Sequence, residues 1–105
     1  MPKFFERQYE VAVCRTDDKD RIACGKTYHV IKNNVGEFSA DPFPFEYEGE
    51  LYIFAELFQY SRDKGVIGFC KMKNDGSFTK WKPVIDEPHH LSFPNIFEFD
   101  GNIYI

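Results

Sequence analysis

Two carboxylates, Asp41 and Glu56, are the side chains of this sequence best suited to chemistry. Between them lies Glu48-Gly49, a pair typical of a two-residue hairpin turn, and a hairpin closed there places Asp41 opposite Glu56. Opposed side chains share one face of a sheet, with Cβ atoms about 4.5–5.5 Å apart. Because two ionised carboxylates at that distance repel, we expect the pKa of one to be raised. The pair is a candidate for general acid-base catalysis, for holding a cation or for accepting hydrogen bonds from sugar hydroxyls.

Each member of the pair also has a structural interpretation. Asp41 can serve only to turn the chain before Pro42, and Glu56 can be a solvated strand end. His89 and His90 are candidate ligand-binding residues, with His90 directed toward the same site as Asp41, and the alternative is that both are loop residues. We expect no metal site and no cofactor.

One segment of the chain returns after 52 positions. The stretch ADPFPFEYEGELYIFA at 40–55 is followed by SFPNIFEFDGNIYI at 92–105, and the two align without a gap. The matched pairs are Pro42 and Pro94, Phe45 and Phe97, Glu46 and Glu98, Gly49 and Gly101, and Tyr52 and Tyr104. A constant offset of roughly 50 residues is typical of propellers, solenoids and other stacked repeats. Position 93, the equivalent of Asp41, is Phe, so the second copy does not duplicate the carboxylate.

Strand patterns account for most of the remaining chain. The expected strands cover 8–15, 26–32, 42–47, 50–58, 66–73, 78–85 and 102–105. The range 50–58 is apolar at both alternating sets of positions, which indicates a strand covered on both faces. Lysines accumulate in the later strands, so we expect burial to decline from the first strand of the meander to the last. The polar stretch 33–39 is expected to be a connection, and Trp81 a packing residue between neighbouring sheets.

These features predict an all-β fold of four-stranded antiparallel blades, present here as a partial β-propeller of about two blades. The single segment 1–105 would contain the outer strands of a preceding blade (8–32), a complete blade (40–87) and the inner strands of the next blade (92–105). Open strand edges and uncovered apolar faces in such a segment predict self-association through those edges.

The composition of the chain limits which binding partners and which cellular location we expect. The formal net charge is −4 and the basic residues are scattered among acids, so we expect no nucleic-acid partner. No apolar run approaches the ~20 residues that span a bilayer, and the N-terminus lacks a signal h-region, so we expect no membrane partner and a cytoplasmic location. Cys14, Cys24 and Cys70 have no zinc-like spacing and are interpreted as free thiols; the alternatives are a Cys14–Cys24 bridge or a metal shared with His29.

Two motifs carry a family resemblance. The first motif is ADPF at 40–43, followed by YEGELYIFAE, and the second is HLSFP at 90–94, followed by FDGNIYI. Together they resemble the five-bladed β-propeller superfamily of arabinanases, xylosidases, invertases and levansucrases. They resemble more closely the propeller module of the glucosamine inositolphosphorylceramide transferase N-terminal family, over 38–105. The resemblance implies that Asp41 matches the base or nucleophile of the glycosidases. Their second Asp and acid Glu come from later blades, which lie beyond the residues of this chain.

Two classes of function follow. The first is a carbohydrate-binding or carbohydrate-processing segment, glycoside-hydrolase-like, with Asp41 and Glu56 as candidate catalytic residues and His89 and His90 as ligands of a glycan. We do not expect catalysis by this chain alone, because a glycosidase needs two carboxylates flanking the scissile bond in a shaped cleft. The alternative is a non-catalytic interaction or scaffold module, or an accessory domain of a glycosyltransferase.

Overall fold

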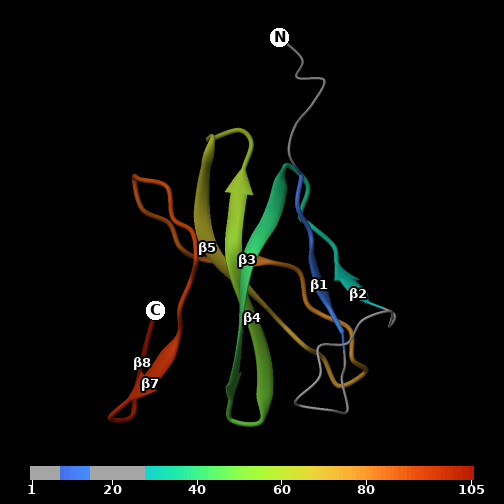
Figure 1. The fold of residues 1–105 in the computed structure, drawn as a ribbon, viewed down its shortest axis with the longest axis vertical. Coiled ribbons are helices and arrows are strands. Elements are labelled where there is room, and N and C mark those ends of the chain that lie inside the picture. The colour runs from blue at the N-terminus through green and yellow to red at the C-terminus, as the bar shows by residue number, and fades with distance from the viewer. Residues whose placement is uncertain (1–7, 15–27) are drawn as a thin grey trace.

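A four-stranded antiparallel sheet occupies the centre of the molecule, and its strands follow one another in chain order. The computed structural model describes residues 8–14 and 28–105. The central strands are β3 (Glu37–Tyr47), β4 (Glu50–Gln59), β5 (Lys64–Lys71) and β6 (Lys82–Ile85). Two antiparallel pairs flank them, namely β1 (Val11–Val13) with β2 (His29–Ile31), and β7 (Phe97–Phe99) with β8 (Asn102–Tyr104). Figure 1 shows the two pairs on opposite sides of the central sheet.

The predicted all-β class is confirmed for the described residues, in which every element is a strand and every strand pair is antiparallel. Several strands are shorter than expected. The expected strand at 78–85 is regular only from Lys82, while Phe78 makes an isolated bridge to Met72. Positions 26–27 of an expected strand lie outside the described residues. In the ranges 8–14 and 28–105 there is no helix long and apolar enough to cross a membrane.

The repeat in the sequence is also a repeat in the backbone. At the end of β3, Glu48 (φ 51°) and Gly49 (φ 78°) form the turn, and Asp100 (φ 51°) and Gly101 (φ 78°) form the equivalent turn between β7 and β8. Positive φ at both central residues defines the type I′ hairpin, whose twist matches that of the strands. The pairing next to the turn is also equivalent, because Tyr47 pairs with Glu50 as Phe99 pairs with Asn102.

A β-bulge interrupts β3 between Ala40 and Phe43. The register set by the turn holds as far as Phe43 opposite Phe54, but beyond the bulge Ala40 lies opposite Glu56. The prediction that Asp41 is the residue opposite Glu56 is therefore wrong by one position, because the bulge adds a residue to one strand only.

Beyond the bulge the strand continues, so the expected polar connection at 33–39 is wrong for its last three residues. Glu37, Phe38 and Ser39 pair with Gln59, Phe58 and Leu57. The rings of Phe38 and Phe58 stack with centroids 4.9 Å apart, and Gln59 Nε2 donates to Glu37 Oε2 at 3.1 Å. Cross-strand pairs of this kind stabilise the extension of the hairpin.

The core has two parts, one on each face of the central sheet. On one face Ile53, Ala55 and Leu57 of β4 pack with Trp81 and with the first sheet, which consists of β1 and β2. On the other face Phe54 packs with Ile67 of β5 and Ile96. The prediction that the 50–58 strand is covered on both faces is thus confirmed, and Trp81, 4% exposed, is a packing residue as expected.

The expected decline of burial along the meander is wrong for its first strand. β3 alternates between partly buried and exposed residues from Asp41 to Tyr47, whereas β4 has five consecutive buried residues from Ile53 to Leu57. β3 is an edge strand of the central sheet, and an edge strand has a neighbour on one side only. The last strand, β6, is also at an edge and is less buried than β4, as expected.

Leu57→Ala tests the first part of the core. Leu57 is 1% exposed, so truncation should leave a cavity and reduce the free energy of unfolding by about 2–5 kcal/mol. Urea denaturation followed by Trp81 fluorescence measures the change. Val35→Ala is the control, because Val35 is fully exposed and its truncation should alter stability by less than about 0.5 kcal/mol. Equal effects of the two substitutions would contradict this description of the core.

Candidate functional site

Glu56 is a buried carboxyl on the most buried strand. It lies on β4 between Ala55 and Leu57, with an exposed fraction of 7%. Burial, a hydrogen bond to Asp41 and the charge of Asp41 together raise the pKa of Glu56 to about 7. A carboxyl with that pKa is partly protonated at neutral pH and can donate as well as accept a hydrogen bond.

Asp41 reaches Glu56 because of the bulge. Its φ is 53°, in the left-handed region, which Asp tolerates better than most residues but which is disfavoured before a proline such as Pro42. The side chain of Asp41 therefore hydrogen-bonds to Glu56 although Ala40 is the residue in register. The expected contact of the two carboxyls and the expected rise of one pKa are both present. The contact depends on the bulge, however, and not on the regular register that was predicted.

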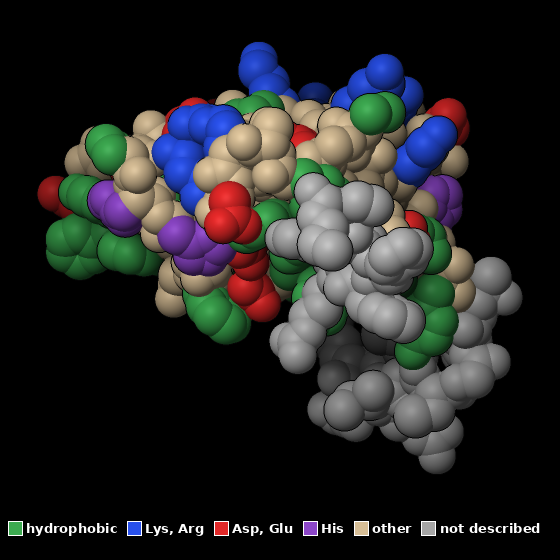
Figure 2. Space-filling model, turned by 90° about the horizontal axis from the view of Figure 1, so that it is seen from above, with side chains coloured by type: hydrophobic (Ala, Val, Ile, Leu, Met, Phe, Trp, Pro, Cys, Tyr) green, Lys and Arg blue, Asp and Glu red, His purple; other side chains and the backbone are tan. Residues whose placement is uncertain are grey.

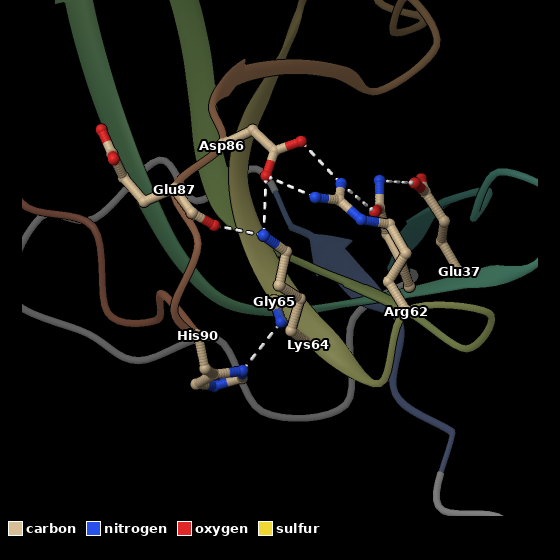
Figure 3. A network of polar contacts seen from close by, with 8 residues as sticks. Glu37, Arg62, Lys64, Gly65, Asp86, Glu87 and His90 are labelled. Carbon is tan, nitrogen blue, oxygen red and sulfur yellow. Dashed lines mark hydrogen bonds and ion pairs between the residues drawn. The ribbon is translucent and has the colours of Figure 1, made fainter.

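His90 contacts the other side of Glu56. His90 Nε2 lies 3.1 Å from Glu56 Oε1, and His90 Nδ1 accepts a hydrogen bond from the Gly65 N–H at 2.7 Å. Figure 3 shows the imidazole below Gly65, joined to it by this bond. His89 is exposed and makes no hydrogen bond or ion pair with any other described residue. The structure thus brings His90, but not His89, to the carboxyl pair.

Gly65 is required at its position on β5. A Cβ there would lie 2.5 Å from the Leu91 carbonyl oxygen and 2.8 Å from Glu56 Oε1. The Leu91 N–H in turn donates to the Gly65 carbonyl at 2.9 Å. The chain around Leu91 therefore lies directly against the backbone of β5, and no side chain fits between them.

An open pocket of about 420 Å³ adjoins the carboxyl pair. Asp41 and Glu56 line it together with Tyr9, Phe38 and Pro42. The ring of Tyr9, which is half exposed, meets the ring of Phe38 edge to face at 5.4 Å. Sequence reasoning missed both aromatic residues. The alternation of Phe38 with Ala40 could have extended the strand, whereas the place of Tyr9 depends on how the first sheet packs and has no local signal.

Charged side chains next to the site form a brace. Arg62 donates two hydrogen bonds to Asp86, at 2.6 and 2.9 Å, and Lys64 pairs with the same carboxylate at 2.9 Å and with the Glu87 carbonyl. Figure 3 shows this brace between the turn after β4 and the chain after β6, beside His90. Hydrogen bonds from Arg62 and Lys64 hold the pKa of Asp86 below its usual range. The space-filling view in Figure 2 shows histidine and acidic side chains adjoining on this end of the molecule.

The cysteines and metal ligands give no second site among residues 8–14 and 28–105. Burial raises the pKa of the Cys70 thiol to about 12, so Cys70 is an inert core residue. Cys24, a member of the alternative bridge, lies outside the described residues. In the described part of the chain no three His, Cys, Asp or Glu side chains are placed to hold a metal ion.

The raised pKa of Glu56 predicts a pH dependence of stability. A carboxyl whose pKa is higher in the folded protein than its ordinary value of 4.5 stabilises the fold below pH 4.5, and this contribution is lost as the pH rises through about 7. Glu56→Gln removes the titration, so the stability of wild type relative to this variant should fall between about pH 4.5 and pH 7. Denaturation midpoints across this range measure it. Glu98→Gln is the control on an exposed strand, and an identical pH profile for all three proteins would contradict the assignment.

Comparison with known proteins gives the family. The family model described as glucosamine inositolphosphorylceramide transferase 1, N-terminal, matches residues 20–105. Glucosamine inositolphosphorylceramide transferase 1 of Arabidopsis thaliana is 38% identical over 71 residues, which cover 65% of this chain and 9% of that protein. The proteins of the same name from the indica and japonica subspecies of Oryza sativa are each 32% identical over 69 residues, with the same coverage.

The matches cover most of this chain but only a small part of the relatives. The chain spans 9% of the length of the curated relatives that it matches. No solved structure matches it. Because the family model covers most of the chain, including the whole central sheet and the carboxyl pair, the chain belongs to the glucosamine inositolphosphorylceramide transferase 1 N-terminal family.

Proposed function

We propose that this chain is a non-catalytic sugar-recognition element of the accessory N-terminal region of a glycosyltransferase-related protein. The observation that carries the proposal is the hydrogen-bonded pair of Asp41 and Glu56 at an open pocket beside two aromatic rings. Sugars present hydroxyl groups around the edge of a ring and C–H groups on its faces. The pocket offers carboxyl groups for the first and the rings of Tyr9 and Phe38 for the second.

The charge of the pocket supports a hydroxyl-rich ligand over a phosphate. Glu10, Asp41 and Glu56 line it, and no Lys or Arg is among its described lining residues. An anionic ligand would meet like charge there, which is unfavourable in a partly dry site. A sugar hydroxyl can donate to the carboxyl oxygens of the pair that remain free to accept a hydrogen bond.

The arrangement of the two carboxyls argues against glycoside hydrolysis. Glycosidases keep their carboxyl groups roughly 5–9.5 Å apart, on opposite sides of the bond to be cleaved. Asp41 and Glu56 are instead hydrogen-bonded to each other, which leaves no room for a glycosidic bond between them. We therefore assign them to binding and not to acid-base catalysis.

The family supports an accessory role. The curated relatives are named as transferases, and their name contains an amino sugar, glucosamine, and an inositol-bearing lipid, inositolphosphorylceramide. We infer that the region to which this chain belongs helps such a protein to recognise the carbohydrate part of a substrate.

We also propose that the central sheet is one blade of a propeller. Support comes from the offset of 52 positions, at which both the turn geometry and the left-handed residue before proline recur. The central sheet and the β7–β8 hairpin would then be successive blades, with the pocket at the end where β4 finishes.

Binding of glucosamine, N-acetylglucosamine and myo-inositol tests the proposed function. Asp41→Asn keeps a residue that tolerates the left-handed backbone but removes the charge, so affinity for the best of these ligands should fall about tenfold or more. Isothermal titration calorimetry measures it. Asp100→Asn is a matched control, because Asp100 also has a positive φ but lies at the remote β7–β8 turn.

A second variant addresses the aromatic side of the pocket. Tyr9→Ala should weaken binding several-fold through loss of ring contact. The proposal fails if no saccharide binds, or if Asp41→Asn and Asp100→Asn bind equally well.

A further inference from the structure

The imidazole of His90 joins three elements of the fold. Its Nδ1 accepts from the Gly65 N–H of β5 at 2.7 Å, and its Nε2 lies 3.1 Å from Glu56 Oε1 of β4. His90 itself belongs to the chain that runs from β6 toward β7, where the neighbouring Leu91 N–H bonds to the Gly65 carbonyl. Both ring nitrogens therefore have a partner, Nδ1 on β5 and Nε2 on β4.

These contacts determine the tautomer of the ring. A backbone N–H can only donate, so Nδ1 must carry a lone pair and no proton. The single proton of the neutral imidazole is therefore on Nε2, directed at Glu56 Oε1. Protonation of His90 would place an N–H on Nδ1 directly against the Gly65 N–H. The two donors cannot share the bond, so the charged ring must leave Gly65.

The chain held by this contact carries part of the core. Leu91 packs against the cluster of Phe54, Ile67 and Ile96, and Ile96 is 3% exposed. The same stretch leads directly into β7 at Phe97. Loss of the bond to Gly65 therefore loosens the stretch 90–96 at its first residue, next to the hairpin that follows.

The charged groups around His90 decide the direction of the response. From β4 it faces Glu56, and from β3 Asp41 lies behind Glu56 as its hydrogen-bond partner. On β5, Lys64 next to Gly65 is held by Asp86 and the Glu87 carbonyl. From β4 the ring of Phe58 also faces His90, with ring centroids 6.1 Å apart. Acidification neutralises Glu56, whose pKa is about 7, and so removes the charge that would compensate an imidazolium. The ring is about half exposed, so a released imidazolium can be solvated.

We propose that His90 is a proton-operated latch, which in its neutral form holds the stretch 90–96 against β4 and β5 and on protonation releases it. The latch does not require a ligand in the pocket. It couples the charge state of the carboxyl pair to the docking of the stretch 90–96, because Glu56 contacts both Asp41 and His90.

NMR of the ¹⁵N-labelled protein between about pH 5 and about pH 8, the range over which histidines change charge, tests the latch. At the upper end Nδ1 of His90 should be unprotonated and hydrogen-bonded. As His90 protonates, the Gly65 amide signal should shift with the same midpoint. The protection factor of the Leu91 amide, corrected for the intrinsic pH dependence of exchange, should fall by about tenfold. A protonated His90 with unchanged Gly65 and Leu91 amides would overturn the proposal.

Two variants separate the two contacts of the ring. In His90→Asn the amide oxygen replaces Nδ1 and cannot gain a proton, so Leu91 protection should no longer fall as the pH is lowered. In His90→Gln the amide nitrogen replaces Nε2 but Gly65 loses its acceptor, so protection should be low at both ends of the range. His89→Asn is the matched control and should titrate like wild type. Leu91 protection that still falls on acidification in His90→Asn would show that another group is the switch.

Discussion

The burial of one carboxyl, that of Glu56, is the constraint on which the arrangement of this site depends. A polar group removed from water costs several kcal/mol unless it is hydrogen-bonded, and a charge costs more. Glu56 lies in the middle of a strand that is covered on both faces and is only 7% exposed, so most of its partners must come from the protein. The partners come from the bulge of β3, which presents Asp41, and from the chain after β6, which presents His90. Gly65 on β5 provides the space in which they meet.

The two copies of the repeat show which part of this arrangement belongs to the scaffold. Asp41 and Phe93 have almost the same left-handed φ, 53° and 51°, and each precedes a proline. The backbone feature is therefore present in both copies, although only Asp tolerates it well, and Phe93 is largely exposed. Only the first copy of the repeat has a carboxylate at this position. The left-handed backbone before proline alone makes no site, and the site at Asp41 arises because a residue with suitable chemistry occupies that position in the first copy.

Sequence patterns predicted those features that depend on neighbouring residues. The all-β class, the turn at Glu48-Gly49 and the burial of both faces of β4 follow from alternation and from turn composition. The bulge could not be predicted, because nothing in Asp41-Pro42 distinguishes a bulge from a simple strand start, and so the register was displaced by one residue beyond it. Even so, the two carboxyls were expected to meet, and they do. The left-handed backbone of Asp41 directs its side chain to Glu56 although Ala40 is the residue in register.

The other features that the sequence did not reveal are contacts between distant parts of the chain. Tyr9 reaches the pocket only because the first sheet packs against β3, and His90 finds Gly65 across 25 positions. No periodicity or local motif encodes such a meeting. It depends on the twist of the sheet and on the course of the chain after β6, and these are determined by packing of the whole domain.

The bare backbone at Gly65 also has a consequence for the order of folding. The surface on which Leu91 lies exists only after β4 and β5 have paired, because Leu91 bonds to Gly65 of β5 and packs against a cluster that contains Phe54 of β4. The hairpins close short loops, whereas docking of the stretch 90–96 closes a longer one, so we expect its hydrogen bonds to form last. Contacts that form after the transition state govern the rate of unfolding more than the rate of folding. The contact at Gly65 is therefore a determinant of how long the native state persists, and the hairpins determine how quickly it is reached.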